Sequence, residues 1–309
     1  MTEPLLQVKK LVKNFGTFRA LDGISFEIPK GKVVGLLGPN GAGKTTTINI
    51  LLGITSADSG SVRYFNKDFS KNPRFCLQRI NFTSAYNNLQ GRISVWENLL
   101  VFAHLYEIKN PENKIKELVG YFEITDLLNQ RFWDLSSGQK TRVNLVKALL
   151  NDPEIILMDE PTASLDPDIT DKTLNLIEKL RQDRQLSILY TSHNMDEVTR
   201  ICDEVIFLDR GKIVAQDTPL GLTKQIKSVQ LRLTFDGDDA LVEKYLRTTK
   251  QGFKFEASFE VVINTTEKLV PKTIFEISKL GVEVTNIEVK KPTLEDVFLQ
   301  IARKEPNVA

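Results

Sequence analysis

The chain has 309 residues, of which 41% are hydrophobic and 26% are charged, and its formal net charge at pH 7 is +1. These values are typical of a globular protein with one large and one small domain, and the near-neutral charge gives no electrostatic case for a nucleic-acid partner. Only two cysteines are present, which argues against a disulfide framework or a zinc site and suits a reducing cytosol. No apolar run reaches the ~18 residues of a membrane helix and no signal peptide opens the chain, so any membrane role requires a partner.

The first half of the chain changes from strand patterns to helix patterns. Residues 5–35 alternate apolar and polar side chains, which predicts antiparallel strands. Residues 32–37 form a short apolar strand, and residues 45–52 read as the helix that follows a glycine-rich loop. Helical periodicity then predominates, and we expect a helical subdomain at about 78–150.

Strands and helices alternate again in the second half. Residues 155–158 and 187–190 are predicted strands, and residues 205–214 are a predicted hairpin. Alternating β and α units indicate a largely parallel sheet. Beyond a boundary near Pro219, mixed strand and helix patterns indicate a small α+β domain. We therefore expect an α/β domain over 1–222 and an accessory α+β domain over 223–309.

One segment fits the phosphate-binding pattern G-x-x-x-x-G-K-[ST] at every fixed position. Glycines let successive backbone N–H groups point at one anion, and the helix that follows adds its positive end. Lys44 supplies a charge for the β- and γ-phosphates, and the Thr45 hydroxyl suits Mg²⁺. The strand before the loop and the helix after it are the context that the motif requires. The predicted nucleotide-binding residues here are Gly38, Pro39, Asn40, Gly41, Ala42, Gly43, Lys44, Thr45 and Thr46.

Two acids follow the predicted strand at 155–158. Acids at the carboxyl end of such a strand reach the crevice where ligands bind in an open parallel sheet. Asp159 suits a Mg²⁺ partner, usually through water, and Glu160 suits the group that orients or polarises an attacking water. Acidic pairs in loops are usually just solvated, but the four apolar residues before this pair and Pro161 after it favour a site.

A third motif, Leu135 to Gln139, precedes a helical run. Serine and glycine at a helix N-terminus form a second anion site. At this point the chain resembles the ATP-binding-cassette (ABC) ATPases, whose signature is L-S-G-G-Q. The other motifs follow in the same order over residues from about 5 to 220. Asp166 lies in a segment similar to the family's D-loop, His193 matches its switch histidine, and Phe15 stands where an aromatic ring stacks on adenine.

The resemblance implies a P-loop NTPase fold with a mixed sheet and a helical subdomain, with ATP and Mg²⁺ as ligands. It also implies a head-to-tail homodimer, in which each nucleotide lies between the P-loop of one copy and the signature of the other. Asp166 would link the two sites. The residues implied to act in cis are Lys44, Thr45, Asp159, Glu160 and His193, and those implied to act in trans are Ser136, Ser137, Gly138 and Gln139.

The chain departs from the family pattern at two positions. Ser137 replaces the first glycine of the signature, where close backbone approach is at stake. Ala85 falls where the family carries its Q-loop glutamine, and a methyl group can neither ligate Mg²⁺ nor sense the γ-phosphate. Ser84 or a shifted Gln90 remain open as substitutes.

The use of the ATP is inferred from the resemblance. Residues 294–298 are similar to the closing motif of the accessory domain in ABC-2-type exporter ATPases. The leading interpretation is an ATPase that powers export through a separate membrane permease and lies on the cytoplasmic face of the membrane. The alternatives are a soluble ABC-type ATPase acting on ribosomes or nucleic acid, and a regulator that binds nucleotide without turnover. His104 and Trp133 are interpreted as packing residues.

Overall fold

The structure is a computed structural model that describes residues 3–86, 88–249 and 251–303. The chain divides into two compact units, the first extending to Pro219 and the second running from Leu220 to Gln300, with the chain from Ile301 grouped with the first. This division falls close to the predicted boundary at 222/223. Each unit is described by itself below.

The larger unit begins with a four-stranded antiparallel sheet. Its strands are β1 (Leu6–Phe15), β2 (Phe18–Ile28), β4 (Ser59–Tyr64) and β5 (Lys67–Asp68), in the order β2-β1-β4-β5. The alternation of apolar and polar residues in the first 35 positions accounts for β1 and β2, because one face of each strand is buried and the other is exposed to solvent.

A six-stranded sheet forms the second layer of this unit. All its neighbouring pairs are parallel except the β9–β10 hairpin. Because parallel strands end at one edge, the loops after β3, β8 and β7 meet there. The order is β10-β9-β3-β8-β7-β6, with β3 (Val33–Leu37), β6 (Ile80–Ser84), β7 (Ile155–Asp159), β8 (Ser187–Thr191), β9 (Glu204–Asp209) and β10 (Lys212–Asp217).

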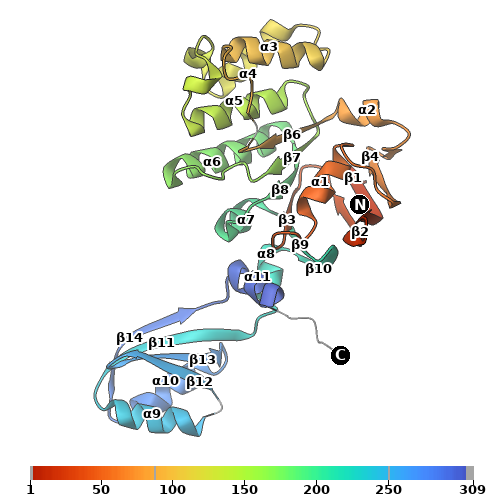
Figure 1. Cartoon of the computed structure of the whole chain (residues 1–309). Helices are drawn as coiled ribbons and strands as arrows, with labels where there is room; N and C mark the ends of the chain where they lie inside the picture. Colours follow the sequence, from red (N-terminus) through yellow and green to blue (C-terminus); the bar gives the residue numbers. More distant parts are fainter. Residues whose placement is uncertain (1–2, 87, 250, 304–309) are drawn as a thin grey trace. The chain divides into compact units, whose positions relative to one another are not determined.

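Helix α1 (Lys44–Leu51) packs into the core that the two sheets share (Figure 1). Its Ile48 and Leu51 are buried together with Phe26 from the antiparallel sheet and Leu157 from the parallel sheet. This packing holds the start of α1 beside the carboxyl end of β3, where the glycine-rich loop lies.

Three longer helices, α3, α4 and α5, group at one end of the larger unit (Figure 1). The predicted helical stretch also contains strand β6, the edge strand of the six-stranded sheet. The prediction of helical structure from residue 78 was therefore wrong for residues 80–84. These residues are a strand because they pair with β7, and their own sequence pattern does not indicate this. Besides α1, the helices of this unit are α2 (Pro73–Leu77), α3 (Val95–Leu105), α4 (Pro111–Tyr121), η1 (Thr125–Leu127), η2 (Phe132–Asp134), α5 (Ser137–Leu149), α6 (Pro167–Arg184) and α7 (Met195–Ile201). Helix α8 (Pro219–Thr223) starts at the boundary, and its residues from Leu220 belong to the smaller unit.

The smaller unit has the element order β-α-β-β-α-β, a ferredoxin-like split βαβ arrangement. Its antiparallel sheet has the order β12-β13-β11-β14, and α9 and α10 supply Val242, Leu246 and Ile277 to one buried core. This agrees with the predicted α+β architecture. The elements are β11 (Ser228–Asp236), α9 (Asp239–Thr248), β12 (Gly252–Ala257), β13 (Glu260–Thr266), α10 (Val270–Ser278), β14 (Glu283–Lys290) and α11 (Leu294–Arg303).

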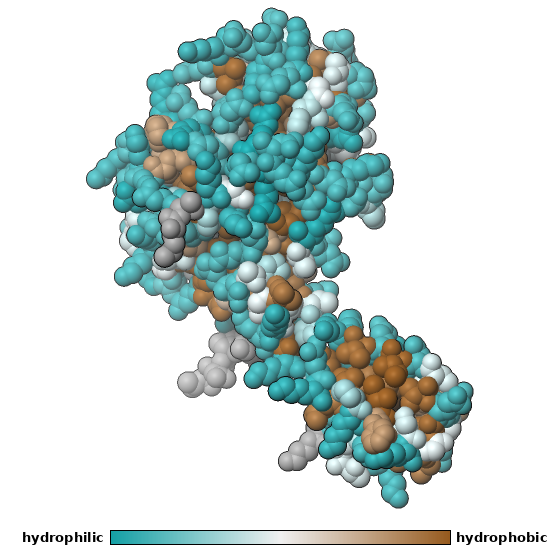
Figure 2. Space-filling model, turned by 180° about the vertical axis from the view of Figure 1, so that it is seen from behind, coloured by the Kyte–Doolittle hydropathy of each residue, from teal (hydrophilic) through white to brown (hydrophobic). Residues whose placement is uncertain are grey.

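The surface of the smaller unit is partly apolar. On the face shown in Figure 2, hydrophobic side chains gather on this unit, and its Phe275 and Ile287 are 61% and 48% exposed. Helix α11 begins with a reciprocal cap, in which the Thr293 and Asp296 side chains bond each other's backbone N–H groups. Among the helices that the structure describes, none is long and apolar enough to cross a membrane.

Candidate functional site

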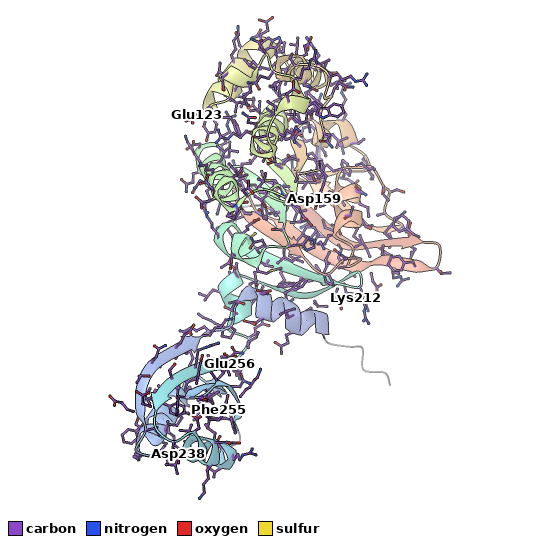
Figure 3. The ribbon with its side chains drawn as sticks, turned by 60° about the vertical axis from the view of Figure 1, so that its left-hand side comes forward. Glu123, Asp159, Lys212, Asp238, Phe255 and Glu256 are labelled. Carbon is purple, nitrogen blue, oxygen red and sulfur yellow. The ribbon has the colours of Figure 1, made fainter. Side chains whose placement is uncertain are left out.

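Three neighbouring parallel strands deliver the predicted site residues to one edge of the sheet. Strand β8 lies between β3 and β7, with Tyr190 opposite Gly35 on one side and Met158 on the other. The glycine-rich loop follows β3, Asp159 and Glu160 follow the core of β7, and His193 follows β8. Figure 3 labels Asp159 near the middle of the larger unit.

The glycine-rich loop requires glycine at its two ends. A Cβ on Gly38 would lie 2.2 Å from the Leu208 carbonyl oxygen, and a Cβ on Gly43 would lie 2.8 Å from the Ala20 carbonyl oxygen. Both residues also have positive φ, at 150° and 111°. The loop therefore presses its backbone against neighbouring strands at the start of α1, an arrangement that can bind an anion as a nest.

Lys44 lies across this loop. Its Nζ donates to the carbonyl oxygens of Gly38 at 2.6 Å and Pro39 at 3.2 Å. Burial lowers the pKa of Lys44, while the charges of Glu160 and Asp159 raise it. The ammonium therefore shares one electrostatic environment with both carboxylates. Thr45, the next residue, is exposed in the first turn of α1 and Thr46 is half-buried.

Thr191 at the end of β8 holds both acids in place. Its hydroxyl donates to Asp159 Oδ1 at 2.5 Å, and its hydroxyl and carbonyl oxygens both accept from the Glu160 N–H at 3.1 Å. These bonds fix Glu160 in a left-handed conformation with φ of 50°, which is uncommon outside glycine and is found at functional sites when the surroundings enforce it.

Glu160 and His193 form a pair. His193 Nε2 lies 2.8 Å from Glu160 Oε1. Both residues line a cavity of about 480 Å³, whose other walls come from the segment after Glu160 and from α6 and α7. A carboxylate bonded to an imidazole in the lining of a cavity can orient a water molecule and accept a hydrogen bond from it.

Two further predicted residues lie apart from this pair. Phe15 ends β1 with 53% of its surface exposed, and Lys13 Nζ is 5.3 Å from its ring centroid. An open aromatic face of this kind can stack on a base. Asp166 is exposed at the N-terminal boundary of α6, where its carbonyl accepts from the Thr170 N–H at 2.8 Å.

The signature segment lies at the start of α5. Ser136 caps the helix, and its side chain and that of Gln139 bond each other's backbone N–H groups. Ser137 is exposed in the first turn. A Cβ on Gly138 would lie 2.7 Å from Ile169 Cγ2 of α6, so glycine here permits close helix packing. The described hydrogen bonds of Ser136 and Gln139 remain within the start of α5 and do not reach the P-loop of the same chain.

Gly138→Ala is expected to destabilise the larger unit by about 1–3 kcal/mol, because the new methyl group would overlap Ile169. Thermal unfolding measures this loss. Ser137→Ala is the matched control, since Ser137 is exposed in the same helical turn. Adding Ile169→Ala to Gly138→Ala should restore part of the stability, and an unchanged stability of the single variant would contradict the close packing.

Ala85 directly follows β6 at the same edge of the sheet. Ser84, the residue before it, pairs with Asp159 across the β6–β7 ladder. The Ser84 hydroxyl accepts from the Tyr86 N–H at 3.2 Å. Gln90 is held elsewhere, because its backbone N–H and carbonyl both bond the Asn98 side chain at 2.9 Å. Of the two proposed substitutes, only Ser84 lies beside Asp159.

Ala85→Gln is expected to raise ATP hydrolysis by roughly fivefold, the equivalent of one hydrogen bond of about 1 kcal/mol. The amide would supply the oxygen that alanine lacks beside Asp159. Ala85→Leu adds comparable bulk without an oxygen and serves as the control. Equal steady-state ATPase rates in wild type and both variants would mean that this position does not contribute.

Sequence reasoning missed two parts of the site and misread two residues. It did not predict the role of Thr191 as a clamp, nor the burial of Glu197 behind His193. The one sequence feature that could have indicated Thr191 and Glu197 is that both lie close to His193 in the chain. Trp133 is 70% exposed and His104 is exposed, so their interpretation as packing residues was wrong. Neither the helical pattern around His104 nor the place of Trp133 before the signature reveals which side chain lacks a neighbour.

Comparison with known proteins identifies the family of the chain. The family model described as ABC transporter matches residues 21–163. The chain is 31% identical over 310 residues to the Nod factor export ATP-binding protein I of Rhizobium sp. (strain N33), with 99% of each chain covered. It is 28% identical over 305 residues to the linearmycin resistance ATP-binding protein LnrL of Bacillus subtilis (strain 168), with 96% and 98% covered.

Solved structures show the same fold. An ATP-binding cassette of an ABC transporter, MJ1267 in its ADP conformation, aligns with a TM-score of 0.64 at 29% identity over 70% of this chain and 92% of the other. The cbiO1 protein of Clostridium perfringens, part of an ABC transporter complex, aligns with a TM-score of 0.66 at 25% identity over 80% and 96%. The chain therefore belongs to the ATP-binding subunits of the ABC transporter family, and the reaction it catalyses is the hydrolysis of ATP.

Proposed function

We propose that the chain is the ATPase subunit of an exporter whose membrane-spanning part is a separate permease. Relatives that align over nearly the whole chain are named for Nod factor export and for linearmycin resistance. A membrane-spanning partner is needed for transport, because the helices that the structure describes include none able to cross a bilayer. The chain would then lie on the cytoplasmic face of the membrane, bound to that permease.

The observation that carries the ATPase part of this proposal is the pairing of Glu160 with His193 at 2.8 Å on the sheet edge that also holds Lys44. In the proposed reaction, the P-loop N–H groups and Lys44 bind the β- and γ-phosphates and Phe15 stacks on the base. Glu160 orients the attacking water, and His193 holds the Glu160 carboxylate in position. Positioning and charge neutralisation carry most of the rate in phosphoryl transfer.

The site fits Mg²⁺ bound together with ATP rather than by the protein alone. Within the described residues, no three His, Cys, Asp or Glu side chains are grouped to hold a metal. Thr45 would bind Mg²⁺ through its hydroxyl and Asp159 would bind it through water, with phosphate and further water completing the shell, as Mg²⁺ prefers. The bound cation would neutralise charge on the phosphate oxygens.

The signature residues act in this proposal from a second copy. Ser136, Ser137 and Gly138 form the first turn of α5, with the two serines exposed and their N–H groups free of the helix ladder. That turn can receive the γ-phosphate of a nucleotide held by the P-loop of a partner copy. A head-to-tail homodimer would thus complete two sites at once, with Asp166 and Gln139 at the contact.

The test is to purify the tagged chain from native membranes in mild detergent. We expect an integral membrane protein to co-purify in stoichiometric amount and to raise the ATPase rate of the chain when reconstituted with it. Recovery of the chain with ribosomes, and of no membrane protein, would instead support a soluble ABC-type ATPase. ATP binding without turnover in the reconstituted complex would support a regulator.

A further inference from the structure

A buried carboxylate lies behind the Glu160–His193 pair and is used by none of the steps above. Glu197, in the first turn of α7, is only 6% exposed. Its Oε2 accepts hydrogen bonds from the hydroxyl groups of Thr162 at 2.6 Å, Tyr190 at 2.9 Å and Ser192 at 3.0 Å. One carboxylate oxygen therefore links α7 to the segment that carries Thr162 and to residues 190–192 at the end of β8.

Both of those segments carry a proposed catalytic group. Ser192 immediately precedes His193, and its hydroxyl also accepts from the Asn194 N–H at 3.0 Å, so the backbone is held on both sides of the histidine. Thr162 lies two residues after Glu160, at the start of the turn that leads toward Asp166. The imidazole itself is half exposed. Its position therefore depends on how its backbone is anchored.

The third contact anchors the carboxylate to the sheet. Tyr190 is fully buried in β8. Burial, and then the neighbouring Glu197 carboxylate, raise the pKa of Tyr190, so its phenol stays protonated and can donate. Hydrogen bonds from three hydroxyl groups to an ionised oxygen are stronger than bonds between neutral groups.

Capping of α7 does not account for Glu197. Asn194 is the N-cap residue of that helix, and its Oδ1 accepts from the backbone N–H groups of Asp196 and Glu197. The Glu197 side chain instead points at the hydroxyl groups of the neighbouring segments. Its burial would be unfavourable without those donors.

We propose that Glu197 is a positioning residue that holds His193 in its geometry with Glu160 through Ser192, while Thr162 and Tyr190 anchor the carboxylate. The proposal rests on the function proposed above. It requires no contact between Glu197 and ATP. Its loss should therefore slow the chemical step and leave nucleotide binding intact.

The test compares Glu197→Gln with wild type in the full-length protein with Mg²⁺ and ATP. We expect kcat to fall about tenfold and KM for ATP to change by less than about twofold. Asp196→Asn is the matched control, because this substitution removes the same charge from the same helical turn at an exposed residue. It should leave kcat within about twofold.

The decisive comparison uses a His193→Ala background, measured in single turnovers. If Glu197 acts through His193, Glu197→Gln should lower the rate there by less than about twofold. A tenfold loss in that background, or an unchanged kcat in the single variant, would overturn the proposal. So would a fall in kcat matched by an equal fall in ATP affinity.

Ser192→Ala covers the case in which Glu197→Gln does not fold. It removes one donor beside His193, and a fall in kcat of about threefold with unchanged KM is expected. An unchanged kcat in this variant would also overturn the proposal. Failure of the proposed function is distinguishable, because Glu160→Gln would then leave hydrolysis intact, whatever the result at Glu197.

Discussion

Glu160→Gln is expected to lower the rate of ATP hydrolysis by about 10²–10⁴-fold while leaving ATP bound, the range by which a positioned acid–base group accelerates a reaction. The amide keeps the shape of the side chain and its contact with His193, 2.8 Å away in the wild type. It loses the charge that would polarise a water molecule. Steady-state phosphate release and ATP retention on a desalting column measure the two effects.

The same variant should accumulate as a closed dimer. With hydrolysis blocked, saturating ATP and Mg²⁺ should convert Glu160→Gln from monomer to dimer in analytical ultracentrifugation, while wild type returns to monomer as ATP is consumed. Asp168→Asn is the control, since Asp168 is an exposed acid in the first turn of α6. A Glu160→Gln protein that remains monomeric under these conditions would contradict the two-copy site.

Lys44→Ala is expected to weaken ATP binding by at least about 100-fold, which corresponds to about 2.7 kcal/mol. The ammonium is the only full positive charge in the P-loop, and it lies across the loop on the carbonyl oxygens of Gly38 and Pro39. Its removal also leaves Asp159 and Glu160 facing the phosphates without a neutralising charge. Titration of the protein with a fluorescent ATP analogue measures the loss.

The exposed Lys9→Ala serves as the control for this experiment, because Lys9 lies on the wet face of β1. The thermal stability of Lys44→Ala should remain close to that of wild type, since the loop glycines already determine the loop shape. An affinity within threefold of wild type would show that the phosphates are bound elsewhere.

The amino-acid sequence determined the local chemistry of this protein. The P-loop pattern predicts an anion nest from residue types alone, because only glycine allows Gly38 and Gly43 to approach the backbone of Leu208 and Ala20 so closely. The apolar strand before Asp159 likewise predicts an acid at a sheet edge, because a buried strand must end where its side chains become polar. Both features depend only on short stretches of the amino-acid sequence, so they can be recognised without knowledge of the tertiary structure.

Only the tertiary structure decided how these segments meet. Residues 80–84 form edge strand β6 because β7 pairs with them, which no pattern within those residues reveals. The Thr191 clamp and the Glu197 cluster join residues up to 35 positions apart through side-chain hydroxyl groups. Gly138 serves helix packing because Ile169 lies against it. Such contacts depend on strand order and helix docking, which are set by burial of the whole core rather than by any one segment.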